Sequence, residues 1–433
     1  MSSSLETGGG LPRSTFTLLF GISVVTAMGN TGLISVMPAI AREIGIPDVL
    51  AASVFSFSSL LWAITSPFWA RASDRHGRRP MILIGVAGFT VSTVVCAVVV
   101  LAGLKHMAAP LTIFGLFFIL RALNGLFGSA ANPAAQAYVA EHTPPEGRTK
   151  AMSSLAGGFG LGTVFGPFMA PLFVLPFVGL SGPLFGFALL GVALWVLLWL
   201  RLPESRPPLE AERDPEEGLR PPIWRDRRVI PFLIYGFLVS ICQSGQGQTL
   251  GFLIIDKLGI APLQAHGFIA IAMMFGAVAS LLAQWGLIPM FEMTPRQLLR
   301  WGVVVAAAGN LVVAMAPDYW IAVAGYAISS LGFGLARPGF TAGASLAVGQ
   351  ADQARTAGAI GAVNGVNVVF APFFVLAYKG WAPGPFLFAG MTMAAMVVYA
   401  FRNPQLRAAD PHPAGTSAAT QAALERSDEG PAA

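Results

Sequence analysis

Long apolar stretches recur from one end of this chain to the other, and they constrain its fold more than any other feature. Each holds about 18 residues or more with few charges, which is enough for a helix to cross roughly 30 Å of hydrocarbon at about 1.5 Å per residue. Only 11% of the 433 residues are charged, whereas a soluble domain carries roughly 25%. The sequence therefore predicts an all-α membrane protein.

The apolar stretches fall into two sets of six. We expect twelve transmembrane helices, at residues 15–40, 49–70, 81–104, 111–140, 151–178 and 181–201, and then at 229–254, 264–288, 297–316, 319–347, 355–378 and 383–402. Residues 202–228, between the sets, are proline-rich and dense in charge, as in a solvated linker. The predicted domains are thus an N-terminal tail (1–14), two six-helix bundles (15–201 and 229–402) joined by this linker, and a disordered tail (403–433).

The positive charges predict the orientation of the helices. Twenty of the 26 Lys and Arg residues fall on the side that holds both termini and the linker, and four fall on the other side. Because Lys and Arg accumulate in cytoplasmic loops, we expect both termini in the cytoplasm. The net charge of +5 is then an orientation signal, and no nucleic-acid partner is needed to explain it. The first stretch is too long for the apolar part of a cleaved signal peptide.

A short polar motif separates the second and third stretches. It reads Asp74-Arg75-His76-Gly77-Arg78-Arg79. Gly77 permits a tight turn, because glycine alone adopts positive φ at no cost. The motif and the residues before it resemble the loop signature of the major facilitator superfamily, Gly-x-Leu-Ala-Asp-Arg-x-Gly-Arg-Arg/Lys, with two alanines in place of the first Gly and the Leu.

This resemblance implies a role for the motif in gating. Asp74, assisted by Arg75, Gly77 and Arg78, would latch the two bundles together on the cytoplasmic side while the cavity faces outward. The alternative is a plain positively charged loop that only sets the orientation. The corresponding loop of the second half, residues 290–296, has diverged from the signature.

The fourth stretch contains an arginine far from either end. Arg121 lies roughly 13–15 Å from the outer end by helical rise. A charged side chain at this depth costs several kcal/mol unless it faces a cavity or a partner, so it is a functional candidate. The segment Arg121-Ala122-Leu123-Asn124-Gly125 resembles the superfamily's Arg-x-x-x-Gly motif. The alternative is a structural arginine that bonds carbonyls of neighbouring helices.

The fifth stretch carries a glycine stripe followed by a proline. Gly158, Gly162 and Gly166 are spaced four apart, so they share one helix face and allow another helix to approach closely, and Pro167 frees a backbone carbonyl. The run resembles the antiporter motif of drug/proton antiporters in this superfamily. Plain helix packing is the alternative.

Polar side chains inside apolar helices predict a substrate cavity. They are Asn30, Arg121, Asn124, Gln243, Gln246, Gln248, Arg337, Asn364 and Asn367. In the superfamily, spans one, four, seven and ten line the central cavity, and most of these residues belong to those spans. An interhelical hydrogen bond is the alternative for each amide.

The acidic residues are placed differently. All 21 fall in loops, in tails or at the ends of predicted spans. A carboxylate in a cavity would be the usual proton carrier, because burial raises its pKa. Here Asp74, Glu43 and Glu141 are peripheral candidates, so proton coupling rests on the resemblance.

Together these features predict a secondary transporter that works by alternating access. The resemblance implies proton-linked efflux of drug-like or amphipathic small molecules, with multidrug resistance as the consequence, across a bacterial inner membrane. The alternative is import or export of one defined metabolite, such as a vitamin, nucleobase or sugar, which the buried arginines favour if the solute is anionic. We expect no enzyme activity, no cofactor and no metal site, and a monomer whose partners are its substrate, protons and the lipid bilayer.

Overall fold

The computed structural model describes residues 11–204, 223–349 and 352–409. Within these ranges the chain is almost entirely helical, which confirms the predicted all-α class. The first half contains α1 (Arg13–Ile44), α2 (Asp48–His76), α3 (Arg78–Leu104), α4 (Pro110–Leu126), η1 (Gly128–Ala130), α5 (Ala131–Glu141), α6 (Pro145–Met169), η2 (Ala170–Phe173) and α7 (Gly182–Arg201).

The second half repeats this helical pattern. It contains η3 (Ile223–Arg225), α8 (Ile230–Leu258), α9 (Pro262–Leu281), η4 (Leu282–Leu287), α10 (Ile288–Met290), α11 (Pro295–Met315), α12 (Tyr319–Leu346), α13 (Gln353–Val366), η6 (Asn367–Phe370), α14 (Ala371–Gly380), α15 (Gly384–Arg402) and α16 (Pro404–Arg407). Several predicted spans are built from two consecutive helical segments. One example is the fourth, where η1 separates α4 from α5.

Eleven helical stretches within the described ranges are long and apolar enough to cross a membrane. They match eleven of the twelve predicted spans. The remaining prediction, residues 229–254, falls on α8, which has 29 residues but is not among the eleven. We attribute this to Gln243, Gln246 and Gln248, which lower its mean hydropathy.

The turn between α2 and α3 is much shorter than predicted. The predicted spans 49–70 and 81–104 leave residues 71–80 between them, whereas α2 continues to His76 and α3 begins at Arg78. Gly77 alone makes the turn, with φ of 96°. A helix can continue past the bilayer, so the end of an apolar stretch does not mark the end of its helix. The opposite error occurs in the fifth span, where α6 ends at Met169 and η2 continues only to Phe173, short of residue 178.

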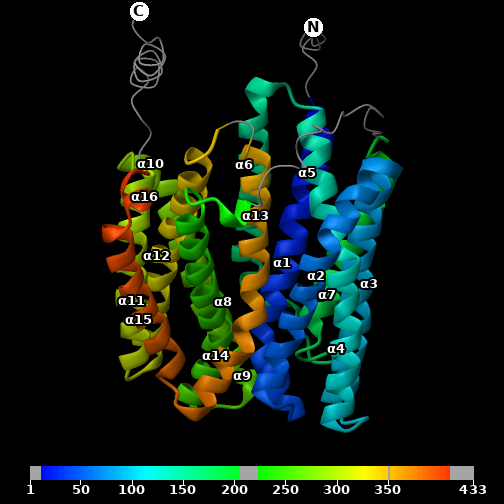
Figure 1. Cartoon of the computed structure of the whole chain (residues 1–433). Coiled ribbons are helices and arrows are strands. Elements are labelled where there is room, and N and C mark those ends of the chain that lie inside the picture. The colour runs from blue at the N-terminus through cyan, green and yellow to red at the C-terminus, as the bar shows by residue number, and fades with distance from the viewer. Residues whose placement is uncertain (1–10, 205–222, 350–351, 410–433) are drawn as a thin grey trace, which may run out of the picture.

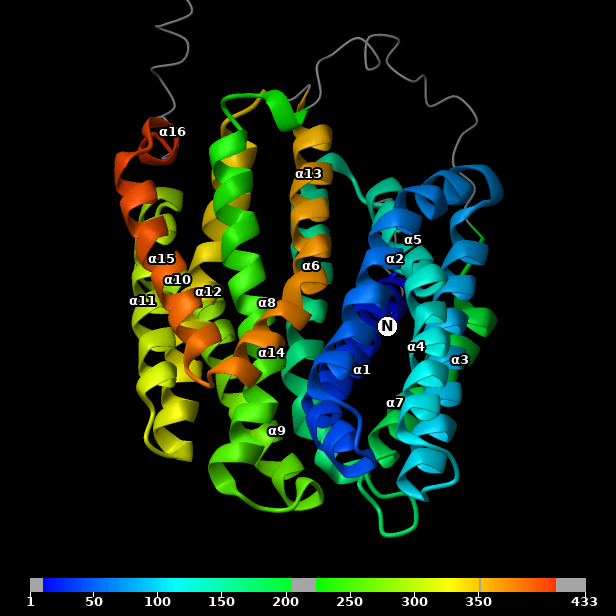
Figure 2. The ribbon, with the colours of Figure 1, turned by 60° about the horizontal axis from the view of Figure 1, so that its bottom comes forward.

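Helices pack mainly against others of the same half. In the first half α1 packs on α6, α3 on α7 and α2 on α4, and in the second half α11 packs on α12 and α15. Figures 1 and 2 both show α3 and α4 at one side of the molecule and α11 and α15 at the other. Contacts between the halves run from α1 and α6 to α9, and from α2 to α13 and α14. The two halves therefore meet along a few helices.

The molecule has two ends, which we name by their turns. The α2–α3 end holds the turn at Gly77, and the α1–α2 end holds the turn between α1 and α2, at the bottom of Figure 1. Part of the predicted C-terminal tail is helical at the α2–α3 end, since α16 packs there with Leu406 only 1% exposed. The predicted tail residues 1–10 and 410–433, and linker residues 205–222, lie outside the described residues.

Candidate functional site

Arg121 and Asn30 form a buried polar pair between α4 and α1. The Arg121 side chain is 3% exposed, and its Nη2 donates a hydrogen bond to Asn30 Oδ1. Its Nε is buried without a hydrogen-bond partner. A guanidinium can donate five hydrogen bonds and cannot serve as a proton carrier. The pair thus offers a fixed positive charge with an unused donor.

The surroundings of Arg121 hold its helix against α2. Ser58 Oγ on α2 donates to the backbone oxygen of Arg121, 3.2 Å away. A Cβ at Gly125 would lie 3.0 Å from Leu61 Cβ and would overlap the Ser58 carbonyl, so α4 needs glycine there. Asn124 is 4% exposed, and its Oδ1 is buried without a partner. The Arg-x-x-x-Gly segment therefore combines a close helix contact with unsatisfied polar atoms.

The polar residues of the second half form two separate contacts. Gln246 on α8 donates to Ser329 Oγ on α12. Arg337 on α12 is half-buried, and its Nη2 lies 3.5 Å from Asn364 Oδ1 on α13. Asn367 bonds back to the Asn364 carbonyl at 3.0 Å, whereas Gln243 is half-buried. An Arg–Asn contact thus occurs in each half.

A small pocket lies between the halves. It is lined by Ile34, Met37, Pro38, Ala51, Ala52, Phe55, Gln248 and Phe252, which belong to α1, α2 and α8. The lining is apolar apart from Gln248, which is 7% exposed and whose Nε2 has no partner.

The glycine stripe of α6 faces α1. A Cβ at Gly162 would overlap the Val24 carbonyl oxygen and lie 2.7 Å from Ala27 Cβ, and one at Gly166 would overlap Thr31 Oγ1. Thr31 Oγ1 also lies 3.4 Å from the Gly162 carbonyl oxygen. A Cβ at Gly158 would meet the Phe20 ring at 2.9 Å. Pro167 lies within the last turn of α6. The stripe therefore makes the α1–α6 contact of the first half.

The motif at the α2–α3 end is drawn together around Arg78. This side chain is 8% exposed; its Nη1 donates to Asp74 Oδ1 at 2.6 Å and to Ser73 Oγ at 3.0 Å. Its Nε donates to Glu141 Oε1 on α5 at 2.9 Å. Asp74 is more than half exposed, and Arg75 is exposed. These contacts join α2, α3 and α5 of the first half. The predicted contact of Asp74 with the second half stays a prediction.

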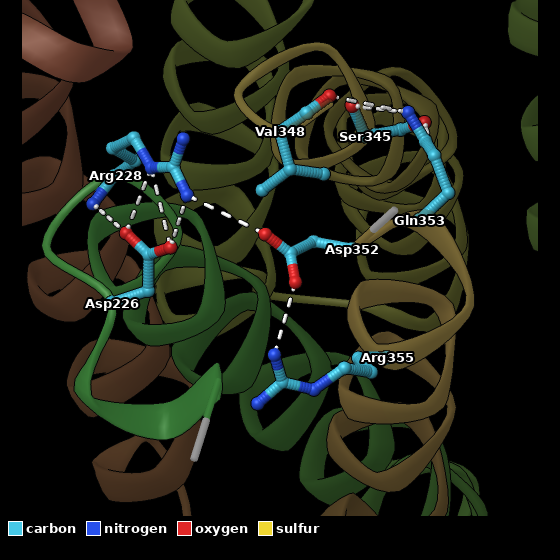
Figure 3. Close-up of polar contacts among 7 residues, drawn as sticks. All are labelled: Asp226, Arg228, Ser345, Val348, Asp352, Gln353 and Arg355. Atoms are coloured by element: carbon cyan, nitrogen blue, oxygen red, sulfur yellow. Dashed lines mark hydrogen bonds and ion pairs between the residues drawn. The ribbon is translucent and has the colours of Figure 1, made fainter. Parts of the chain in front are cut away.

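The second half has an ionic cluster of its own at this end, shown in Figure 3. Asp226 Oδ2 and Arg228 Nη2 are 2.7 Å apart, and Asp352 lies between Arg228 and Arg355. The Arg228 guanidinium holds the pKa of the Asp226 carboxyl below its ordinary value of 3.8. The cluster ties the segment before α8 to the start of α13.

A third ionic cluster, at the α1–α2 end, was missed by sequence reasoning. It contains Arg42, Asp48, Asp256, Tyr378 and Lys379, from α1, α2, α8 and α14. Asp48 is 2% exposed although it is the first residue of α2. The position of an acidic residue relative to a span end carries no information about its burial by another helix.

Metal ligation finds no support in the described residues. They contain no group of three or more His, Cys, Asp or Glu side chains placed to hold a metal ion. Cys96 and Cys242 are both buried free thiols.

Several known proteins resemble this chain, some of them over most of its length. It is 26% identical over 392 residues to Multidrug resistance protein 1 of Bacillus subtilis (strain 168), covering 88% of this chain and 94% of that one. It is 29% identical over 180 residues to the Gallate transporter of Pseudomonas putida, covering 42% of this chain and 37% of that one. Among solved structures, the POT family transporter PepTSo aligns with a TM-score of 0.71 at 14% identity, covering 93% of this chain and 100% of that one. The family model of the Major Facilitator Superfamily matches residues 19–372, so the chain belongs to this superfamily of transporters.

Proposed function

We propose that this transporter exports drug-like or amphipathic small molecules in exchange for protons. Its twelve spans, with α8 as the seventh, form two six-helix bundles, 15–201 and 229–402, joined by the linker 202–228. The α2–α3 end and both termini face the cytoplasm of a bacterium, and the protein works as a monomer. The bundles rock about a central site, which opens in turn to either side.

The observation that carries this proposal is the Asn30–Arg121 pair. Arg121 is buried in an apolar helix, and one of its donors has no partner. Such a group is costly in a membrane unless something fills its remaining hydrogen-bonding capacity. We assign that role to an acceptor group of the substrate. The similarity to Multidrug resistance protein 1 along 88% of this chain supports a drug-like substrate.

A defined anionic metabolite is the second candidate. A guanidinium suits a carboxylate, because its fork of donors matches two oxygens. Arg337, the other arginine of the predicted cavity, is half-buried and adds another positive group. The partial similarity to the Gallate transporter fits such a solute.

The test is transport by the purified full chain in liposomes. The pH difference and the membrane potential are imposed separately, with ethidium, tetracycline and gallate as probes. We expect a pH difference alone to drive ethidium or tetracycline uphill, opposite to the proton flow, and protein-free liposomes to show no such movement. If only the probe's own gradient or the membrane potential moves a probe and a pH difference does not, proton exchange is contradicted. Uphill movement of gallate alone would favour the second candidate.

A further inference from the structure

One guanidinium at the α1–α2 end binds a carboxylate from each half of the molecule. Arg42 Nε and Nη2 each lie 2.8 Å from an oxygen of Asp48 on α2. On its other side, Nη1 lies 2.7 Å and Nη2 3.3 Å from the two oxygens of Asp256 on α8. Both contacts are two-pronged, the arrangement in which arginine is most selective. Arg42 thus joins α1 and α2 to the second half.

A second ionic contact crosses between the halves in the opposite sense. Lys379 Nζ on α14 lies 3.8 Å from Asp48 Oδ2, and the neighbouring Tyr378 hydroxyl donates to Asp256 Oδ2 at 2.6 Å. Each half therefore supplies one cation and one carboxylate. Of the neighbouring charges, Glu43 is exposed and Lys257 donates to the Ala316 carbonyl oxygen.

This distribution lets the contact break without isolating a buried charge. An unpaired buried ion is strongly destabilising. If the halves separate, Asp48, which is 2% exposed, keeps Arg42 as its partner in its own half. Asp256, whose side chain is 44% exposed, keeps the Tyr378 hydroxyl and can be hydrated. A permanent ion pair would not need a second partner for each carboxylate, whereas a contact that opens and closes does.

An apolar layer lies against this ionic contact. The Arg42 guanidinium lies over the Phe252 ring, 5.7 Å from its centre, and Phe252 lines the pocket between the halves. One residue earlier, Gly251 touches Pro38 so closely that a Cβ would lie 2.9 Å from Pro38 Cβ and would overlap its Cγ. This contact joins α8 to α1. Exclusion of water from this apolar layer would strengthen the adjacent ionic contact, because charges attract more strongly at a lower dielectric constant.

We propose that Arg42 and Asp256 are a latch that holds the transport path closed at the α1–α2 end. The proposal rests on the proposed function in one respect, that the two halves rock and that this end faces outward. Asp48 positions Arg42, Lys379 adds the second crossing contact, and Gly251 allows α8 to approach α1. The latch lies at the end opposite to Asp74 and uses different residues.

The test measures access to the pocket behind the latch. In a chain with Cys96 and Cys242 replaced by alanine, Ala52→Cys places a thiol in the pocket, where Ala52 is 2% exposed. A membrane-impermeant maleimide is added from outside to cells or to oriented vesicles, with no substrate and no ion gradient. We expect Asp256→Asn to speed labelling about tenfold or more, because the two-pronged contact with Arg42 loses its negative charge; tenfold corresponds to about 1.4 kcal/mol.

Two further variants separate the latch from a general loss of structure. Arg42→Lys keeps the charge but loses the fork, and Gly251→Ala keeps all charges but obstructs the approach to Pro38; both should also speed labelling. Asp226→Asn, which alters an Arg–Asp pair within the second half, is the matched control and should label like the parent. Parent-like labelling of Asp256→Asn and Arg42→Lys in folded protein would overturn the latch. The labelling experiment contains no substrate, so its result does not depend on whether the protein transports drugs or protons. The latch and the proposed function can therefore be refuted separately.

Discussion

At the scale of single residues, the central feature is a polar atom left without a partner in an apolar helix. Arg121 and Asn310 illustrate the difference between a candidate site and plain structure. Both are buried, and each has an atom without a hydrogen-bond partner. Arg121 bonds across to another helix, whereas Asn310 Nδ2 bonds within α11, to the Ala306 carbonyl oxygen at 2.8 Å. Only the first is placed between helices that we assign to the cavity.

This difference gives a prediction for Arg121. In Arg121→Lys the charge remains but the bond to Asn30 and the free donor are lost, and we expect transport per folded molecule to fall about tenfold or more. The reason is that hydrogen bonds to charged groups contribute about 1.5–3 kcal/mol. Uptake of the transported probe into liposomes and thermal unfolding in detergent are measured side by side. Asn310→Ala, the control, should lower the unfolding temperature and keep transport. If the loss of folded protein accounts for the whole loss of transport in Arg121→Lys, Arg121 is a structural arginine.

At the scale of helices, close packing decides where glycine is required. Gly162 on α6 lies against α1, whereas Gly160 lies toward α9, where a Cβ would meet Leu281 at an ordinary 3.5 Å. We therefore expect Gly162→Ala to destabilise the fold by about 1–3 kcal/mol, the typical cost of overpacking. Gly160→Ala should have little effect on stability. Thermal unfolding of both variants in detergent tests this, and equal unfolding temperatures would show that α1 and α6 can move apart at no cost.

The sequence predicts the helices well and their ends poorly. Hydropathy places eleven stretches correctly because it reports transfer into hydrocarbon. It misplaces the end of α2, because helical hydrogen bonds continue to His76 beyond the apolar run. The positive φ of Gly77 was predictable, since a motif of charged residues broken by one glycine marks a turn.

The same limit applies to the sites. The Asn30–Arg121 pair was within reach of sequence reasoning, because a polar residue in an apolar helix is conspicuous. Asp48 and Asp256 were missed, since their role depends on which helices meet at the α1–α2 end. The contacts of Arg42 with both carboxylates join residues up to 214 positions apart in the chain. No spacing rule along the sequence reports such a contact.

At the scale of the whole molecule, ion pairs among the described residues join different partners at the two ends. At the α2–α3 end, Arg78 binds Asp74 and Glu141 within the first half, and Arg228 binds Asp226 and Asp352 within the second (Figure 3). At the α1–α2 end, two ion pairs join one half to the other. The pairs that join the halves at the α1–α2 end fit a molecule held closed there, and alternating access requires that the other end close in its turn.

Alternating access is tested most directly by two distances measured in the same protein. Spin labels at Glu43 and Trp381, both exposed at the α1–α2 end, report on that end, and labels at Arg71 and Met290 report on the α2–α3 end. Both pairs join the first half to the second, and double electron–electron resonance is recorded in liposomes with and without tetracycline or ethidium. We predict two distance populations for each pair. When addition of the probe or a change of pH lengthens the distance at one end, the distance at the other end should shorten. A single unchanging distance at both ends would contradict the account.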